Sequence, residues 1–258
     1  MTIDTDFHSH VARSSARQMA QAAREKGLRI LGLSEHIFQM TEARPTLRHL
    51  PEEGPTLTFS EYSDAVRAAA QEAGIETRLG LEVDFIPGLN EQIQAFLPGH
   101  DWDFLIGSVH EVDGIFFEYD KVTDRAKGEA RWLRYFALLR EVATCGAFSL
   151  VSHPVRMRIE NAFLPPTCDD ELEHLASEAA RCNVALEING SDVLRYTNLV
   201  RRLARACALH STPVSVGSDA HYPARVAQAH TLSEEILREA GIREVRIWRR
   251  MEPEAYQF

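Results

Sequence analysis

Histidine and carboxylate side chains recur in this sequence at positions where they could bind a metal ion. The first group is in "TDFHSH", which places Asp6, His8 and His10 at intervals of two residues near the N-terminus. Side chains alternate between the two faces of an extended strand, so these three would share one face. Two imidazoles on one face can bind one cation, but a solvated strand end also explains so short a motif.

The elements that must position these residues alternate between two patterns along the whole chain. Seven short apolar segments have the character of buried strands, and a segment of helical periodicity or helix length follows each of them. The expected strands are residues 3–10, 28–36, 75–85, 103–112, 147–154, 184–190 and 213–221. The expected helices are residues 14–26, 60–73, 88–97, 126–145, 168–182, 192–208 and 231–240, and residues 244–249 form a closing extended segment. This alternation predicts an α/β fold with a parallel sheet, either doubly wound or closed as a barrel.

Each expected strand has a possible metal ligand at its C-terminal end, and six of the 11 histidines lie there. Both barrels and open parallel sheets bind ligands at this end. Any one of these histidines is more simply explained as a core or surface residue, but their ordered placement favours a shared site. Mixed imidazole and carboxylate ligands suit Zn, Mn or Fe, and their number indicates at least two ions. The residues at strand ends are His8, His10, His36, Glu82, Asp84, His110, His153, Glu187, Asn189, Asp219 and His221.

Composition excludes several classes of protein. The 258 residues are 45% hydrophobic, which is enough for a sizeable core, and the net charge of −10 argues against a nucleic-acid-binding surface. No run of about 18 apolar residues predicts a membrane span, and the start lacks signal-peptide character, so we expect a cytoplasmic protein. The four scattered cysteines form no C-x-x-C pair, and neither a P-loop nor a G-x-S-x-G motif is present.

Residues 38–59 interrupt the alternation. This stretch contains three prolines and has no clear periodicity. Loops of this length in compact domains are usually functional or disordered. Because the stretch directly follows His36, we expect a lid-like insertion over the metal site that helps to select the substrate.

Seven motifs in order resemble those of the PHP (polymerase and histidinol phosphatase) family. They are "DFHSH", "LSEH", "GLEVD", "GSVHEVDG", "SHP", "LEING" and "GSDAH", and they span residues 4 to 222. "IGSVHEVDG" and "GSDAHYP" are most similar to the histidinol-phosphatase branch. The resemblance implies a distorted seven-stranded (β/α) barrel in a single domain over residues 1–258, with the metal site at the C-terminal ends of the strands.

The resemblance also implies a cluster of two to three divalent ions. Glu82 would bridge the first and second ions, and His36 and His221 would bind the third. Members of the family commonly have a further histidine after the first motif, but this chain reads "VARSSARQ" there, so we expect a weaker third site. The ligands implied for the first two ions are His8, His10, Glu82 and Asp219, and then Glu82, His110 and His153.

The expected activity is hydrolysis of a small phosphomonoester, most simply L-histidinol phosphate to L-histidinol and phosphate, by attack of a metal-bound hydroxide. Asp219 would take part in catalysis as a ligand of the first metal ion. His221 or His36 would stabilise or protonate the leaving alkoxide. Arginines could bind the phosphate oxygens, although any single arginine is more simply a solvated charge. The candidates are Arg156, Arg158, Arg13, Arg44 and Arg48.

Other functions remain open at this stage. A PHP phosphoesterase could act on another small substrate, such as a nucleotide or a phosphodiester. A metal-binding module without catalysis would also fit a weakened third site, since the family commonly has the missing histidine. An amidohydrolase-like enzyme also uses His-x-His on a barrel, but the later motifs fit it poorly. The expected partner is a small phosphorylated substrate, with neither a nucleic-acid polymer nor a membrane.

Overall fold

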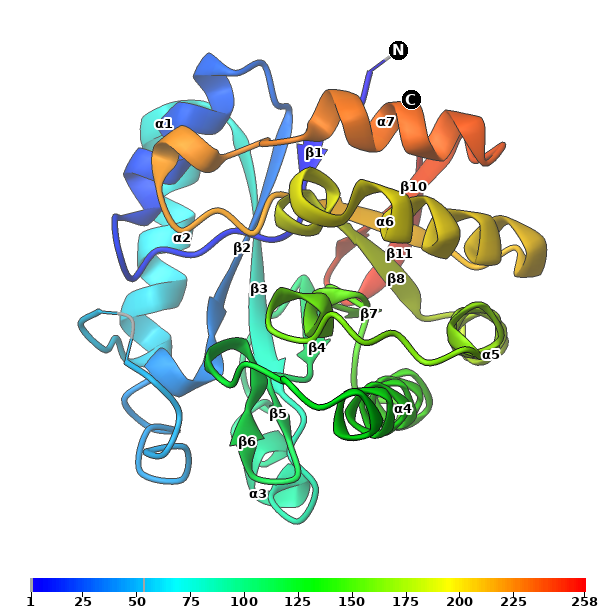
Figure 1. The fold of residues 1–258 in the computed structure, drawn as a ribbon. Coiled ribbons are helices and arrows are strands. Elements are labelled where there is room, and N and C mark those ends of the chain that lie inside the picture. Colours follow the sequence, from blue (N-terminus) through cyan, green and yellow to red (C-terminus); the bar gives the residue numbers. More distant parts are fainter. Residues whose placement is uncertain (1, 53) are drawn as a thin grey trace.

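A sheet of seven parallel strands forms the centre of the protein (Figure 1). The structure, a computed structural model, describes residues 2–52 and 54–258. The strands are hydrogen-bonded to one another in chain order, as expected when each is followed by a helical crossover. They are β1 (Thr5–Asp6), β2 (Ile30–His36), β3 (Glu76–Asp84), β4 (Phe104–Ser108), β7 (Leu150–Val151), β8 (Ala185–Asn189) and β9 (Val214–Gly217). The predicted α/β class is confirmed.

The first and last strands meet, so the sheet is a nearly closed barrel. The backbone N–H of Phe7 donates to the carbonyl oxygen of Val216 at 3.0 Å. Two further backbone hydrogen bonds continue this seam, from Asp219 to His8 and from His10 to Ala220, each at 2.8 Å. Closure decides between the two architectures that strand and helix alternation allows, and it confirms the distorted seven-stranded barrel.

Helices cover the outer side of the sheet (Figure 1). Their ends follow local capping chemistry, as α2 shows: the Thr58 side chain accepts from the Glu61 N–H, and the Glu61 side chain accepts from the Thr58 N–H. The helix ends at Gly74, whose φ of 64° is left-handed. The helices are α1 (Ala16–Glu25), α2 (Phe59–Ala73), α3 (Asn90–Gln94), α4 (Arg125–Thr144), α5 (Cys168–Arg181), α6 (Gly190–His210) and α7 (His230–Glu239).

A hairpin near the C-terminus closes the end of the barrel where the strands begin. It consists of β10 (Glu244–Arg249) and β11 (Glu252–Gln257), which pair antiparallel with each other and lie outside the seven-stranded sheet. Trp248 packs against Phe7 and Phe104, with its ring centroid 5.7 and 6.2 Å from theirs. This end of the barrel is therefore filled by apolar rings, and the polar cluster lies at the other end.

Every strand of the sheet is shorter than the sequence predicts, and for two of them the path of the chain shows why. Residues 103–112 divide into β4 and the first strand of a separate hairpin, β5 (Glu111–Val112) with β6 (Ile115–Phe116). Residues 147–154 contain only the two-residue β7, because the chain leaves the sheet at His153, where φ is 29°. A positive φ is incompatible with a regular strand, and it places the imidazole outside the alternation of the sheet.

Residues 38–59 pack against the body of the protein. Phe38, Met40, Leu47 and Leu50 are buried, and Met40 and Leu57 form an isolated parallel bridge. None of the helices in the described ranges is both long and apolar enough to cross a membrane.

The insertion reaches two segments that follow expected metal ligands. A Cβ on Gly54 would lie 2.5 Å from the carbonyl oxygen of Ala12, and His49 Nε2 is 3.0 Å from Glu111 Oε2. The segment is thus close to the chain just after His10 and to the chain just after His110. This placement is compatible with a lid, and the role itself stays a prediction.

Candidate metal centre

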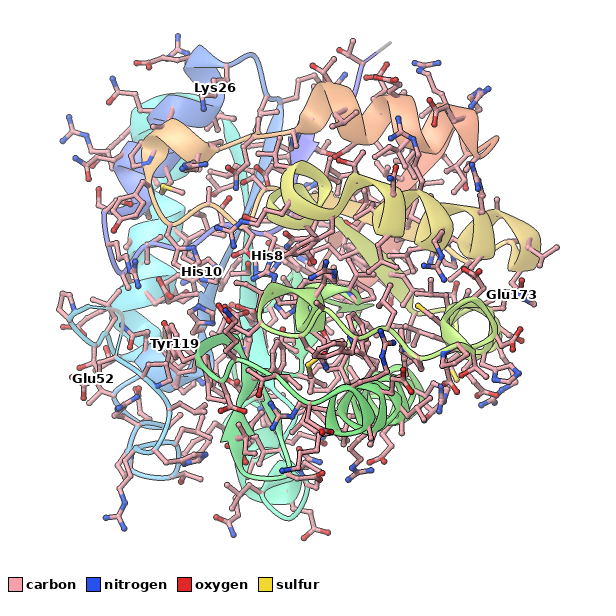
Figure 2. All side chains as sticks on the ribbon, in the orientation of Figure 1. His8, His10, Lys26, Glu52, Tyr119 and Glu173 are labelled. Atoms are coloured by element: carbon pink, nitrogen blue, oxygen red, sulfur yellow. The ribbon has the colours of Figure 1, made fainter. Side chains whose placement is uncertain are left out.

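Glu82 lies at the centre of the histidine cluster. Its Oε2 atom is 2.7 Å from His36 Nδ1, 3.3 Å from His8 Nε2 and 3.6 Å from His10 Nε2. These residues come from β2, β3 and the segment after β1, which are neighbours in the barrel. Parallel strands that end at one edge bring residues far apart in the sequence to one point. Figure 2 shows His8 and His10 near the middle of the molecule.

The other carboxylate oxygen of Glu82 faces two further imidazoles. Oε1 is 3.1 Å from His153 Nε2 and 3.5 Å from His110 Nε2. One carboxylate therefore has imidazoles at both oxygens, which is the arrangement a bridging ligand of two ions requires. The structure thus brings five predicted histidine ligands together around Glu82, and their role as ligands remains a prediction.

Asp219 and His221 complete the cluster from the segment after β9. Asp219 Oδ1 is 3.4 Å from His10 Nε2, 3.9 Å from His8 Nε2 and 3.7 Å from His221 Nδ1. The backbone of Asp219 is left-handed, with φ of 56°, a conformation that Asp tolerates better than most residues. All eight predicted metal ligands are thus in one cluster.

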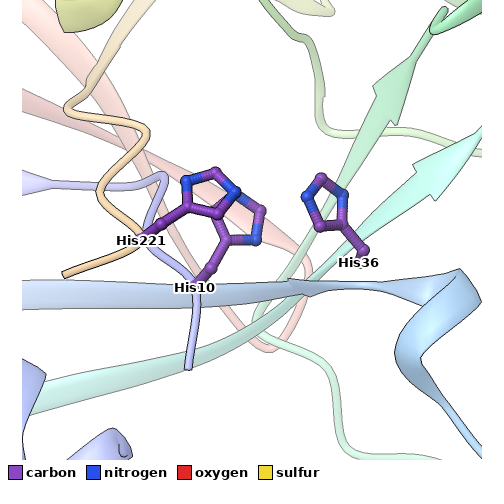
Figure 3. A group of neighbouring side chains, drawn as sticks. All are labelled: His10, His36 and His221. Carbon is purple, nitrogen blue, oxygen red and sulfur yellow. The ribbon is translucent and has the colours of Figure 1, made fainter. Parts of the chain in front are cut away.

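His10 lies between His36 and His221. Its ring centroid is 4.1 Å from that of His36 and 4.2 Å from that of His221, and both pairs are stacked. One nitrogen from each of the three rings falls within 4.8 Å of the others (Figure 3). The sequence predicted a third site with only two imidazoles, and the structure places His10 beside them.

The buried nitrogens and oxygens of the cluster fit divalent metal ions. Nε2 of His8, Nε2 of His10 and Oε2 of Glu82 are buried and make no hydrogen bond to any residue in the described part of the chain. Burying such atoms without partners is costly, and a cation between them would satisfy all three. Imidazole and carboxylate ligands together match Zn, and also Mn or Fe.

Carboxylates behind the imidazoles hold the rings in position. Glu187 Oε1 is 2.7 Å from His8 Nδ1, and Asp84 Oδ1 is 2.7 Å from His110 Nδ1. In both rings the contact leaves Nε2 directed towards Glu82. Such contacts fix the orientation and tautomer of a metal-binding histidine. The sequence placed Glu187 and Asp84 among the possible metal ligands at strand ends. In the structure each contacts the Nδ1 atom of a histidine, on the side of the ring away from Glu82.

Glu35 and Asp6 support the cluster through backbone groups. Glu35 accepts from the N–H groups of Val11 and Ala12, both at 2.6 Å, and its Oε1 lies 3.4 Å from His10 Nδ1. Asp6 accepts from the N–H of Ser218 at 2.8 Å and from that of Ala227 at 3.0 Å. The first residue of the Asp-x-His-x-His motif therefore ties β1 to the loop that carries Asp219 and His221.

The carboxylates shift the pKa values of the buried histidines. Burial lowers the pKa of His10, but its contacts with Asp219 and Glu35 outweigh burial and raise the pKa to about 9. The pKa of His8 is also raised well above its usual value, since Glu187, Glu82 and Asp219 outweigh burial. His153 differs, because burial and the nearby Arg156 guanidinium lower its pKa to about 3.

Arg156 is the one predicted substrate-binding arginine that is buried beside the cluster. Its Nη2 donates to Asp219 Oδ2 at 2.5 Å and to Asn189 Oδ1 at 3.0 Å, and its Nε donates to Asp192 Oδ1 at 2.8 Å. Burial raises the pKa of Asp192 to about 7 in spite of the guanidinium beside it. Arg156 therefore fixes the second oxygen of Asp219 before any phosphate is bound.

The other predicted arginines have different surroundings. Arg158 lies 5.6 Å from the Tyr196 ring centroid, and Arg44 donates to the carbonyl oxygens of Arg48 and Leu50 within the 38–59 insertion. Arg48 is exposed. Arg13 reaches the edge of the cluster, where its Nη1 is 3.4 Å from the Tyr222 hydroxyl. Of these four residues, Arg13 alone lines the cavity beside the metal centre.

That cavity has a volume of about 320 Å³, and Asp219, His221 and Arg156 form its inner wall. Sequence reasoning missed seven residues of the lining, among them Glu118, Arg195, Tyr222 and Arg225. Arg195 and Arg225 follow the ends of β8 and β9, where the loops of a barrel build its active site. That position was a usable signal, but the sequence does not show the direction of a side chain in a loop or in the first two turns of a helix.

Comparison with known proteins identifies the family. The model of the PHP domain matches residues 4–191. This chain belongs to the PHP family. A relative, the "Probable histidinol-phosphatase" of Deinococcus radiodurans, is 30% identical to this chain over 98% of this chain and 100% of its own length.

Solved structures show the same fold. Histidinol phosphate phosphatase from Lactococcus lactis, solved with zinc, L-histidinol and phosphate, superposes with a TM-score of 0.77 at 20% identity and covers 97% of this chain and 98% of its own. A chain of archaeal ribonuclease P with mature tRNA matches with a TM-score of 0.54 at 12% identity, covering 92% of this chain and 87% of its own. The PHP fold predicted from the motifs is confirmed.

Proposed function

We propose that this PHP protein is a metal-dependent phosphatase that hydrolyses L-histidinol phosphate to L-histidinol and phosphate. The observation that carries the proposal is a single buried carboxylate, Glu82, with imidazoles at both oxygens, next to a cavity lined by arginines. The names of the Deinococcus relative and the Lactococcus structure support the choice of substrate.

The cluster would hold two to three divalent ions of Zn, Mn or Fe. His8, His10, Glu82 and Asp219 would hold the first, and Glu82 would share the second with His110 and His153. His36 and His221 would hold a third. When bound, such ions lower the pKa of water and neutralise charge on phosphoryl oxygens.

The residues of the chain would orient the substrate between the ions and the cavity. Arg156 donates to Asp219 and Asn189 through Nη2, to Asp192 through Nε and to Glu118 through Nη1. One N–H group on Nη1 is left, and it could bind a phosphate oxygen. His221 lines the cavity, and its side chain has 23% of its surface exposed, the most of the eight predicted ligands. It is therefore placed to protonate the leaving alkoxide, with the buried His36 as the alternative. Glu118, which also lines the cavity, could pair with the ammonium group of histidinol phosphate.

A phosphate-release screen over small phosphate esters, with Mn²⁺, Zn²⁺ or Fe²⁺ added back, tests the function. We expect L-histidinol phosphate to have the highest kcat/KM, and a His8→Ala, His10→Ala double variant serves as the blank. A preference for a nucleotide or a phosphodiester would favour another PHP phosphoesterase. Metal binding with no release from any ester would favour a module without catalysis.

The proposed partner is a small molecule. A cavity of about 320 Å³ suits a compact ester better than a nucleic-acid polymer, and the net charge of −10 would repel a polyanion. The ribonuclease P neighbour shares the fold with this chain at 12% identity, and that likeness shows no shared partner.

A further inference from the structure

His153 differs from the other histidine proposed for the second ion in how its ring is held. Nδ1 of His110 contacts Asp84 Oδ1 at 2.7 Å. Nδ1 of His153 is buried and has no hydrogen-bond partner among residues 2–52 and 54–258. A metal-binding histidine usually has such a partner behind it, and the partner fixes the direction of the ring. The direction of the His153 ring must therefore come from its backbone.

The backbone of His153 has an uncommon conformation. Its φ is 29°, where a side chain is crowded by its own backbone, and Pro154 restricts the same residue further. A strained backbone of this kind persists only where the surrounding structure holds it. Because the chain leaves β7 just before this point, the imidazole faces Glu82, with Nε2 3.1 Å from Oε1.

Three hydrogen bonds hold the peptide groups of His153. Its N–H donates to Glu187 Oε2 at 2.7 Å. Its carbonyl oxygen accepts from the Arg156 N–H at 2.9 Å, which closes a β-turn with Pro154 at the second position. The same oxygen accepts from the Tyr135 hydroxyl, also at 2.9 Å. Since Tyr135 lies on α4, its hydroxyl ties this turn to the outer layer of helices.

The Tyr135 hydroxyl is a fixed donor. The side chain is fully buried, and its ring packs edge-to-face against Phe117 and Trp132, with centroids 5.2 and 6.0 Å away. Burial raises the pKa of the hydroxyl well above its usual value, and the Asp192 carboxylate adds to this. The hydroxyl therefore keeps its proton near neutral pH, and the packed ring keeps it in place.

We propose that Tyr135 is a positioning residue of the metal centre, whose hydroxyl holds the carbonyl of His153 so that the strained backbone directs the imidazole to the second ion. This rests on the metal centre of the proposed function. Tyr135 touches neither an ion nor the substrate, and it acts through His153. The hydroxyl takes the place, from the backbone side, of the supporting carboxylate that the His153 ring lacks.

The test compares Tyr135→Phe with Tyr256→Phe. Phenylalanine keeps the ring that packs against Phe117 and Trp132 and removes only the donor. Tyr256 is the matched control, because its hydroxyl donates to Asp4 Oδ1 at 2.6 Å and it lies on β11, outside the seven-stranded sheet. Co²⁺ is added stepwise to the metal-free proteins, with its affinity measured by competition with a chelating dye and its ligand geometry by visible absorption.

A third variant, His153→Ala, identifies the second ion as the binding step that this change weakens most. We expect Tyr135→Phe to weaken that step about three- to tenfold, as the loss of one hydrogen bond implies, and to change its absorption band. The first ion should bind as before. On an ester that the protein hydrolyses, kcat should fall more than KM rises, because the fault lies in the metal geometry and leaves the cavity intact.

Tyr256→Phe should alter none of these quantities. Thermal unfolding of the metal-free proteins shows whether either variant is less stable. Unchanged affinity and absorption of the second ion in Tyr135→Phe would overturn the positioning role. An equal loss at both ions would overturn it as well, because general loosening of the fold does not single out His153.

Failure of the proposed function gives a different result. If Co²⁺ binds and no ester is hydrolysed, the phosphatase activity is wrong, but the comparison of affinities still tests Tyr135. If fewer than two ions bind, the nitrogen NMR resonances of the His153 ring in the metal-free protein replace Co²⁺ as the readout. A change in Tyr135→Phe that Tyr256→Phe lacks would support the positioning role, and identical resonances in both would refute it.

Discussion

Glu187 contacts the Nδ1 atom of His8 at 2.7 Å, while the Nε2 atom of the same ring faces Glu82 at 3.3 Å. The second carboxylate oxygen of Glu187 accepts from the backbone N–H of His153 at 2.7 Å. One buried side chain therefore orients two predicted ligands that belong to different ions. Loss of such a supporting carboxylate typically costs a metal site 10- to 100-fold in affinity or activity.

We predict that Glu187→Gln lowers metal affinity or kcat by about 10- to 100-fold while the protein stays folded. The amide keeps the size of the carboxylate but removes the charge that holds His8. Metal content after dialysis and phosphate release are the measurements. Glu173→Gln, on the exposed face of α5 (Figure 2), is the control and should change neither. Normal metal content and kcat in Glu187→Gln would contradict the orienting role.

Metal binding should release protons near neutral pH. In the metal-free protein the pKa of His10 is about 9 and that of His8 is raised well above 6.5, so both imidazoles are protonated at pH 7. A metal needs their lone pairs, so each ring must lose its proton. His153, with a pKa of about 3, is already neutral and releases none.

We expect the protons released per chain to fall as pH rises through about 9, and metal affinity to increase over that range. Calorimetry in buffers of different ionisation enthalpy measures the number of protons released per chain. The raised pKa of His10 also stabilises the metal-free fold fully below pH 6.5, and this stabilisation is lost as pH rises through about 9. A proton count that is zero at pH 7 would show that the histidines are neutral before metal binds.

Occupancy of the three sites should be unequal. His10 Nδ1 faces Glu35 and its Nε2 lies near Glu82 and Asp219, so the first ion would take its one available nitrogen. His36 and His221 would then hold the third ion with water. We predict that two ions persist through dialysis and the third is depleted, as elemental analysis would show.

Ser14→His tests whether this third site lacks only an imidazole, and it should raise third-metal affinity. Ser15 is unsuitable, because its side chain caps α1 by accepting from the Gln18 N–H. Should Arg13 instead replace the third cation at the phosphate, Arg13→Ala would cost far more activity than loss of a surface charge. Three ions held tightly by the unmodified protein would refute the prediction of a weak site.

The 38–59 insertion should select the substrate and leave the metals alone. Arg44 joins its turns by donating to the carbonyl oxygens of Arg48 and Leu50, so Arg44→Ala should loosen it. We expect a change in KM or in the ratio of kcat/KM between two esters, with metal content unchanged, and a stronger effect when the insertion is shortened. Unchanged kinetics on every ester in the shortened variant would exclude a lid.

Gly217 should tolerate no side chain. A Cβ there would lie 2.3 Å from the Cβ of His8 and 2.5 Å from Glu187 Oε1. Gly217→Ala must displace one of them, so we predict a loss of about 1–3 kcal/mol in the free energy of unfolding together with weaker metal binding. Thermal unfolding and metal content are the measurements, and an unchanged midpoint with full metal content would show that β9 shifts freely.

Much of the site could be predicted from the chain because barrel geometry turns sequence order into spatial order. The segments ending in His36, Glu82, His110 and His153 had to finish at one edge once strands and helices alternated. The order of the motifs was sufficient to place every predicted ligand in one cluster. Glu35 is not among the predicted ligands, and the structure directs its carboxylate to His10 and to backbone N–H groups.

Only the tertiary structure decided what depends on side-chain direction and on the meeting of distant ends. Barrel closure depends on backbone hydrogen bonds between residues more than 200 positions apart, such as Phe7 and Val216, and no local pattern encodes them. The placement of His10 between His36 and His221, and that of Arg195 and Arg225 around one cavity, follows from how the loops after β1, β8 and β9 pack. Residue types and strand ends are properties of the chain, and they determined which chemistry is available. Distances between side chains arise from packing across the barrel, so only the fold determined which of the clustered residues contact one another.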